Sequence, residues 1–328
     1  MYVNVKSQLL RLLEENKEKY ISGSMIAKEL SISRTAIWKA VKSLRLEGYE
    51  ISAGTNRGYR LEQSGDILSS AGITRSLKTE GVFLVEVKKS VSSTNKSVRD
   101  LAMKGMPEGY VLAAEGQSAG KGRMGRGFYS PAGHGVYFSI LLRPGSKTRD
   151  ASLITSAAAV ATAQAIDEVL GVKAGIKWVN DLFVREKKVC GILTEAVFGM
   201  ESGMVESAVL GIGINVTKPK DGLPKELENI ATSVTERTEG LGGERCRLIA
   251  AVLDNFWEYY QNLDDREFLE EYRARSIIIG RDILVISGEE QIPAHALAID
   301  DECGLIVRYE NGETAKLSSG EVSIRPMA

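Results

Sequence analysis

The segment Gln117–Pro131 combines four glycines with three cations, Lys121, Arg123 and Arg126. Glycine lets a backbone approach a ligand closely and present its N–H groups, and Lys and Arg neutralise phosphate or carboxylate groups. The segment therefore predicts a loop that wraps an anion. The alternative is a flexible basic loop on the surface.

Two well-known nucleotide-binding motifs resemble this segment, but the segment matches neither of them. Gly120, Gly122 and Gly125 have the spacing G-x-G-x-x-G, but that fingerprint must open a helix. Here the loop continues into the helix-stopping run 128–133. A Walker loop from Gly116 to Lys121 would be one residue short and would lack its Ser or Thr after the lysine. The segment therefore predicts an anion-binding loop, but it predicts neither of the usual nucleotide-binding folds.

A second motif is Lys177-Trp178-Val179-Asn180-Asp181, followed by the run 187–195. A buried strand rarely carries Lys, Asn and Asp so close together. At the end of a strand these groups can converge on a ligand, and Asp181 or Asn180 could hold magnesium. A hairpin whose charges face solvent remains an open alternative.

A third motif alternates glycine with isoleucine, from Gly211 to Asn215. Glycines inside a strand indicate that something packs closely on their face, either a ligand or a neighbouring helix.

The elements that must position these motifs alternate between strands and helices over residues 67–270, as expected for an α/β or α+β domain. The expected strands are Val82–Val87, Tyr110–Ala114, Val136–Leu142, Ile176–Trp178, Asp181–Val184, Gly191–Val197 and Ser207–Val216. The expected helices are Asn95–Lys104, capped by Ser93 or Thr94, Leu153–Leu170 and Cys246–Gln261.

Beyond Ile277 the pattern changes to short strands, and Asn311-Gly312 predicts a tight hairpin turn. The expected strands are Asp282–Ser287, Ile292–Ile299, Leu305–Tyr309, Thr314–Leu317 and Val322–Arg325. They predict a small barrel.

The first 62 residues are basic, with eleven Lys and Arg against seven Asp and Glu, whereas the rest of the chain is acidic. Apolar spacing predicts helices Val5–Glu15, Met25–Leu30 and Arg34–Glu47, followed by strands Tyr49–Ser52 and Tyr59–Leu61. This is the pattern of a winged helix-turn-helix, although a helical protein-interaction module is the alternative. The residues predicted to bind DNA are Ser33, Arg34, Thr35, Trp38, Lys39, Lys42 and Arg57. Among them, Arg34, Thr35 and Trp38 would read bases.

Composition excludes several classes of protein. Three cysteines far apart in the sequence support neither a disulfide framework nor a zinc site, and two histidines make a Ser–His–Asp hydrolase improbable. The sequence shows no signal peptide and no membrane span, so we expect a cytoplasmic protein.

Together the three motifs and the N-terminal winged helix resemble the biotin–protein ligases, over essentially the whole chain. The match is to the bacterial bifunctional class that combines biotin–[acetyl-CoA-carboxylase] ligase with biotin operon repressor. The resemblance implies a multidomain α+β fold. Its domains would be a winged helix (1–62), a central α/β ligase domain with a mixed, class II synthetase-like sheet (63–274), and an SH3-like C-terminal barrel (275–328).

The resemblance also implies roles for individual residues. Lys188 and Arg123 would be catalytic, with Lys188 bridging the biotin carboxylate and the α-phosphate. The residues implied to bind biotin are Ser93, Thr94, Asn95, Gln117, Gly120, Lys121, Arg123, Lys188 and Gly191. Those implied to bind the nucleotide are Arg126, Phe128, Lys177, Asn180 and Asn215, with Asp181 on magnesium. In the barrel, Glu321 and Arg325 are candidates for covering the nucleotide or docking the carrier.

The implied reaction forms biotinyl-5′-AMP from biotin and ATP with Mg²⁺, then transfers biotin to a lysine of a biotin carboxyl carrier protein domain. The adenylate-bound form would be a homodimer that binds operator DNA and represses transcription of biotin genes. Two alternatives stay open: a ligand-sensing regulator without ligase activity, and a lipoate-type ligase.

Overall fold

The computed structural model describes residues 5–16, 19–46, 49–62, 66–144, 151–198, 205–237, 242–287 and 290–324. Arg325 lies outside them. Internal contacts divide the chain into two compact units. One unit comprises residues 1–77 and 239–250, and the other comprises residues 78–238 and 251–328.

The first unit is a helix-turn-helix followed by a two-stranded wing. Its elements are α1 (Val5–Glu15), α2 (Gly23–Leu30), α3 (Arg34–Leu46), β1 (Ile51–Gly54) and β2 (Gly58–Leu61). Apolar residues spaced three and four apart turn inward, so that Leu9, Leu13, Ile26, Ile37 and Leu44 are fully buried. Ser33 caps the N-terminus of α3, because its hydroxyl accepts a hydrogen bond from the Ala36 N–H.

Sequence patterns missed the short helix α4 (Ser70–Ser76), which packs against α1 in this unit. The Ser69 hydroxyl caps it and donates to the buried carboxylate of Glu14 (2.9 Å). The first residues of α7 (Glu244–Gln261) also belong here. Arg245 is almost fully buried and pairs with Asp66 at 2.5 Å, although burial still raises the pKa of the Asp66 carboxyl.

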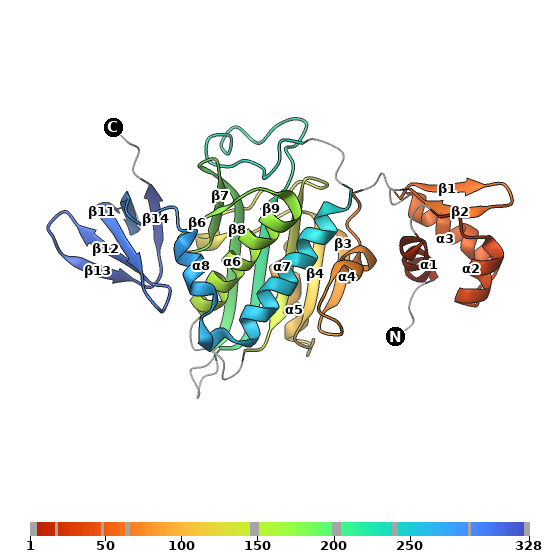
Figure 1. Ribbon diagram of the computed structural model, residues 1–328, viewed down its shortest axis with the longest axis horizontal. Coiled ribbons are helices and arrows are strands. Elements are labelled where there is room, and N and C mark those ends of the chain that lie inside the picture. The colour runs from red at the N-terminus through yellow and green to blue at the C-terminus, as the bar shows by residue number, and fades with distance from the viewer. Residues whose placement is uncertain are drawn as a thin grey trace. The chain divides into compact units, whose positions relative to one another are not determined.

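The second unit is built on a seven-stranded mixed sheet in the order β3-β4-β5-β9-β8-β7-β6. Only the β3/β4 pair is parallel. The strands are β3 (Leu84–Val91), β4 (Tyr110–Gln117), β5 (Gly135–Leu142), β6 (Gly175–Lys177), β7 (Asp181–Val184), β8 (Lys187–Phe198) and β9 (Val205–Asn215). Figure 1 shows α6 (Ala151–Leu170) and α7 lying across one face of this sheet, whereas α5 (Thr94–Ala102) contacts β4, β5 and β9.

Helix α6 is long and apolar enough by composition to span a membrane, but 72% of its most apolar stretch is buried inside the protein. Such burial is typical of a core helix. Strand β8 begins four residues earlier than predicted, because Arg185 and Glu186 adopt left-handed conformations (φ 51° and 65°) and reverse the chain. The charged residues at the start of β8 therefore belong to a paired strand, which the hydrophobic pattern did not reveal.

After the short helix α8 (Phe268–Ala274), also missed, the chain forms a five-stranded antiparallel sheet in the order β13-β12-β11-β10-β14. The strands are β10 (Asp282–Ser287), β11 (Glu290–Ile299), β12 (Leu305–Tyr309), β13 (Thr314–Leu317) and β14 (Glu321–Ile324). Ile283, Ala296, Leu305 and Val307 fill its core. The expected multidomain α+β fold is confirmed.

Candidate active site

The sequence motifs converge on one cavity of about 450 Å³ in the second unit. It lies where the β4–β5 loop, β7, β8 and β9 meet the segment 223–231 and β14. The predicted site residues that line it are Ser93, Thr94, Asn95, Gln117, Lys121, Arg123, Arg126, Phe128, Lys177, Asn180, Asp181, Lys188, Gly191 and Asn215. Gly120 does not line it. A Cβ at Gly120 would lie 2.5 Å from the Phe128 carbonyl oxygen, so this glycine lets the loop fold on itself.

The paired glycines of β8 and β9 form the floor under an aromatic ring. Gly191 and Gly213 are register partners, and a Cβ at Gly213 would lie 2.6 Å from the Phe128 ring. At Gly211, by contrast, a Cβ would lie 1.9 Å from the amide oxygen of Asn95. Gly211 and Gly213 face the same side of β9, where they make room for the start of α5 and for the Phe128 ring, respectively.

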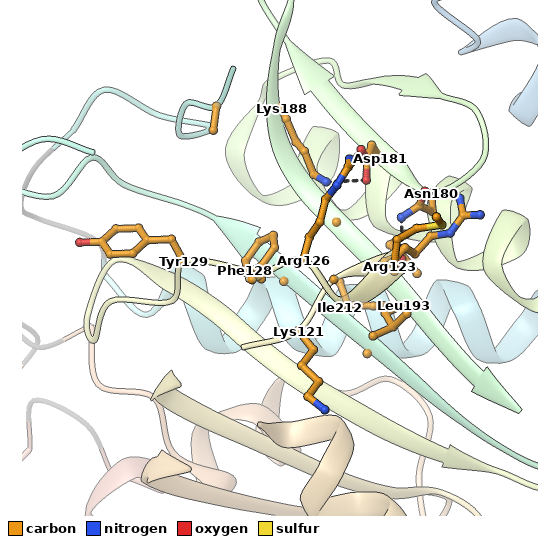
Figure 2. Close-up of a pocket in the computed structure, with 18 of the residues that line it drawn as sticks. Lys121, Arg123, Arg126, Phe128, Tyr129, Asn180, Asp181, Lys188, Leu193 and Ile212 are labelled. Carbon is orange, nitrogen blue, oxygen red and sulfur yellow. Dashed lines mark hydrogen bonds and ion pairs between the residues drawn. The ribbon is translucent and has the colours of Figure 1, made fainter. Parts of the chain in front are cut away.

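Three of the pocket cations, Lys188, Arg126 and Arg123, have polar partners within the protein, and Figure 2 shows Lys188 beside Asp181. The Lys188 ammonium lies 2.7 Å from the Asp181 carboxylate, and Arg126 pairs with Glu321 of β14 at 2.6 Å. Arg123 donates to the Asn180 side-chain oxygen (3.1 Å). In Figure 2 the side chain of Lys121 points away from the Lys188–Asp181 pair.

Asn180 joins the loop to the sheet. Its amide nitrogen donates to the Ile192 carbonyl (2.8 Å), and its backbone carbonyl accepts from the Ile192 N–H (3.0 Å). Its side-chain oxygen is left to orient Arg123. This single residue therefore connects the cationic loop with β8.

Lys177 is a cation whose charge the surroundings disfavour. Burial lowers its pKa, and the neighbouring Asp181 opposes that shift. Its ammonium lies 5.4 Å from the centre of the Phe183 ring, a cation–π distance. An anionic ligand in the cavity would therefore stabilise the charged form of Lys177.

A second part of the cavity lining is a network of side-chain hydrogen bonds around Gln117 and Asn95. The Gln117 side-chain oxygen accepts from the Thr94 N–H (2.8 Å), and its nitrogen donates to Ser130 (3.0 Å). Asn95 donates to Glu195 (2.9 Å) and accepts from Ser139 (2.6 Å), so protein groups already engage both ends of its amide. Gln117 at the end of β4 and Asn95 at the start of α5 are thereby fixed in orientation.

Several residues that support the site were not predicted from the sequence. The Trp178 indole donates to the Cys303 carbonyl (2.8 Å), and the Tyr272 hydroxyl donates to the Val179 carbonyl (3.0 Å). Both contacts anchor the motif that carries Asn180. These partners lie too far away in the sequence to be found from local patterns.

A second missed group is apolar and comes from the segment 223–231, which contributes Leu223, Leu227 and Ile230 to the cavity. Their spacing of four and three residues among charged neighbours was the available signal. Ile230 is 60% exposed.

Within the described ranges, no three His, Cys, Asp or Glu side chains cluster as a metal site. The carboxylates that line the cavity are Asp181 and Glu321, and each already pairs with a cation. Magnesium commonly binds through one or two carboxylates plus substrate phosphates. These donors fit such an ion only when a phosphate ligand completes its coordination.

In the first unit, the predicted DNA-binding residues are all exposed. Ser33, Arg34, Thr35, Lys39, Lys42 and Arg57 are exposed, and so is the large side chain of Trp38 (55%). Lys42 lies over the Trp38 ring, 5.4 Å from its centre.

Family models match each part of the chain. Residues 5–60 match an HTH domain, residues 87–215 match the Biotin/lipoate A/B protein ligase family, and residues 278–325 match the Biotin protein ligase C terminal domain.

Curated relatives match the chain from end to end. The Bifunctional ligase/repressor BirA of Bacillus spizizenii is 35% identical over 99% of this chain and 100% of its own length. The protein of that name from Escherichia coli is 27% identical over 98% of this chain and 97% of its own. A solved biotin protein ligase from Aquifex aeolicus in complex with biotin and ATP is 26% identical, covers 74% of this chain and 98% of its own, and superposes with a TM-score of 0.62. The chain therefore belongs to the family of bifunctional ligase/repressor proteins.

Proposed function

We propose that this protein activates biotin with ATP to biotinyl-5′-AMP and transfers the biotinyl group to a lysine of a biotin carboxyl carrier protein domain. One observation carries the proposal: Lys188, Arg123, Arg126 and Lys177 line a single cavity that also has an apolar glycine and Phe128 floor. The solved relative with biotin and ATP supports these two ligands.

The cations reduce the electrostatic repulsion of the first step, in which the biotin carboxylate must approach a triphosphate. An oxygen of the carboxylate forms a bond to the α-phosphorus, and the bond to the β-phosphate oxygen breaks to release pyrophosphate. Lys188 and Arg123 neutralise the charge on the reacting oxygens. The amine of the carrier lysine then attacks the carbonyl carbon of the mixed anhydride, and AMP leaves.

Other residues bind and cover the substrates. Arg126 and Lys177 bind the phosphates, and Phe128 and Asn215 contact the adenosine. Gln117, Thr94 and the glycine floor accept the biotin ring. Magnesium, held by Asp181 together with phosphate oxygens, would neutralise the triphosphate. Leu223, Leu227 and Ile230 exclude water from the adenylate, because the segment that carries them lines the cavity.

The winged helix adds a second function, repression of transcription by the adenylate-bound protein. Binding of biotinyl-AMP would favour a homodimer, and two winged helices would then bind a palindromic operator. Since the carrier consumes the adenylate, repression would report that the demand for biotin is met. We propose that the protein is cytoplasmic. We also propose that its functional domains are residues 1–62, 63–274 and 275–328.

Intact-mass spectrometry of a biotin carboxyl carrier domain tests the ligase function. The domain is incubated with this protein, Mg²⁺ and ATP, with biotin or lipoate in parallel. We expect one biotinyl addition that depends on ATP. Addition of lipoate alone would indicate a lipoate-type ligase, and no addition with either acid would leave a ligand-sensing regulator.

A further inference from the structure

The wing of the DNA-binding unit packs on an aromatic ring from outside the wing. Tyr20 lies in the connection between α1 and α2, and a Cβ at Gly54 of β1 would be 3.0 Å from its ring. Two guanidinium groups of the wing lie near the same ring. The Cζ atom of Arg60 is 4.8 Å from the ring centre, and that of Arg57 is 5.9 Å away. Both distances are within the range of cation–π attraction.

The backbone holds Tyr20 in this place. The neighbouring residue Ile21 exchanges two hydrogen bonds with Tyr59 of β2, at 2.8 and 2.9 Å, so the connection runs beside the wing like a third strand. Gly58 permits this approach, because a Cβ there would lie 1.9 Å from the Ile21 carbonyl oxygen. The backbone next to Tyr20 therefore cannot move away from the wing without breaking these hydrogen bonds.

The two arginines on the ring differ in their polar partners. Arg60 pairs with Glu62 at 2.7 Å, and Glu62 also accepts a hydrogen bond from Ser52. Arg57 is exposed at the turn, and among the described residues its guanidinium has no hydrogen bond and no ion pair. The donors of Arg57 are available to a ligand, whereas those of Arg60 are engaged within the wing.

We propose that Tyr20 is a positioning residue for DNA binding, which holds the guanidinium of Arg57 so that its N–H groups face a phosphate of the duplex. This inference rests on the proposed DNA-binding function. A long side chain that is already held in place loses less conformational freedom when its partner binds. Stacking on a ring face leaves the planar edge of the guanidinium free for a phosphate. Arg60 and Glu62 stabilise the wing and do not contact DNA.

Fluorescence anisotropy with a labelled random-sequence duplex of several helical turns tests the inference. The full-length protein is supplied with biotin, Mg²⁺ and ATP, and binding is measured over a series of salt concentrations. Tyr20→Ala is expected to weaken binding by about two- to fivefold with the salt dependence retained. Tyr20→Phe, which keeps the ring, is expected to bind like the wild type.

The arginine variants supply the comparison. Arg57→Ala is expected to lower the slope of log affinity against log salt by about one, as for one lost phosphate contact. Arg60→Ala is expected to leave that slope unchanged. In the Arg57→Ala background, Tyr20→Ala is expected to have no further effect, because the side chain that it positions is gone.

Several results would overturn the inference. They are wild-type affinity in Tyr20→Ala, equal loss in Tyr20→Phe and Tyr20→Ala, or independent losses from Tyr20→Ala and Arg57→Ala. ATP–pyrophosphate exchange in each variant checks that the enzyme is folded and should be unchanged. If the wild-type protein itself fails to bind the duplex, the DNA-binding function is wrong and the role of Tyr20 fails with it.

Discussion

Three cations of the candidate active site and two cations of helix α3 differ in whether the protein supplies them with a polar partner. In the pocket, Lys188 and Arg126 pair with carboxylates and Arg123 donates to an amide. On α3, Arg34 and Lys39 are exposed, and neither has an ion pair within the part of the chain that the structure describes.

This difference indicates two kinds of recognition. Polar partners hold the pocket cations in place before any substrate arrives, so that each can act at one defined atom. The cations of α3 offer positive charge to any phosphate backbone, and their effect is summed and screened by salt. We therefore expect single substitutions to abolish the ligase reaction but to weaken DNA binding only gradually.

The largest effect is expected from Lys188→Ala. Removal of the cation that we propose to bridge the biotin carboxylate and the α-phosphate should reduce adenylate formation by about 10²- to 10³-fold. ATP–pyrophosphate exchange measures this step, and binding of the random-sequence duplex without substrates should be unchanged. Lys89→Ala, at an exposed lysine of β3, is the matched control. Full activity of Lys188→Ala would contradict the assigned role.

Gly213→Ala is expected to have the next largest effect. Because the new methyl group would overlap the Phe128 ring, the ring must shift, and we expect the KM for ATP to rise about tenfold. Addition of Phe128→Ala should remove the overlap. The KM for ATP of the double variant should therefore rise by less than the product of the increases in the two single variants. Strictly multiplicative losses would show that the ring and the glycine act independently.

On α3, we expect Arg34→Ala and Lys39→Ala to weaken binding of duplex DNA moderately. Each should lower the slope of log affinity against log salt by about one while leaving the ligase rate unchanged. Anisotropy at several salt concentrations measures the slope. Loss of ligase activity in either variant would remove the distinction between the two regions.

The smallest effect is expected from Glu321→Gln. In the proposed site, ATP must compete with Glu321 for Arg126, and this exposed ion pair has a small net stability. The neutral amide should release the guanidinium, so the KM for ATP should fall about two- to threefold while kcat stays constant. Steady-state kinetics measure both values. A rise in KM would mean that Glu321 orients Arg126 for the nucleotide instead of competing for it.

Local patterns predicted much of the molecule. The apolar spacing of α1 and α3 predicted a buried stripe, which the structure contains. The charged motif around Asp181 left two interpretations open, a ligand site at the ends of strands or a hairpin that faces solvent, and in the structure Asp181 lies beside Lys188 in the cavity. Short or charged elements escaped prediction, because α4 spans only two turns and the start of β8 carries lysines in place of an apolar pattern.

The sequence by itself determined the kinds of element, the order of the domains and the chemical groups that the pocket holds. These properties depend on residue type and on spacings of a few positions. Only the tertiary structure decided which distant partners hold those groups, such as Glu321 on Arg126 and the Cys303 carbonyl on Trp178. Such pairs depend on the crossing of strands and on how closely backbones approach, and no local spacing encodes either.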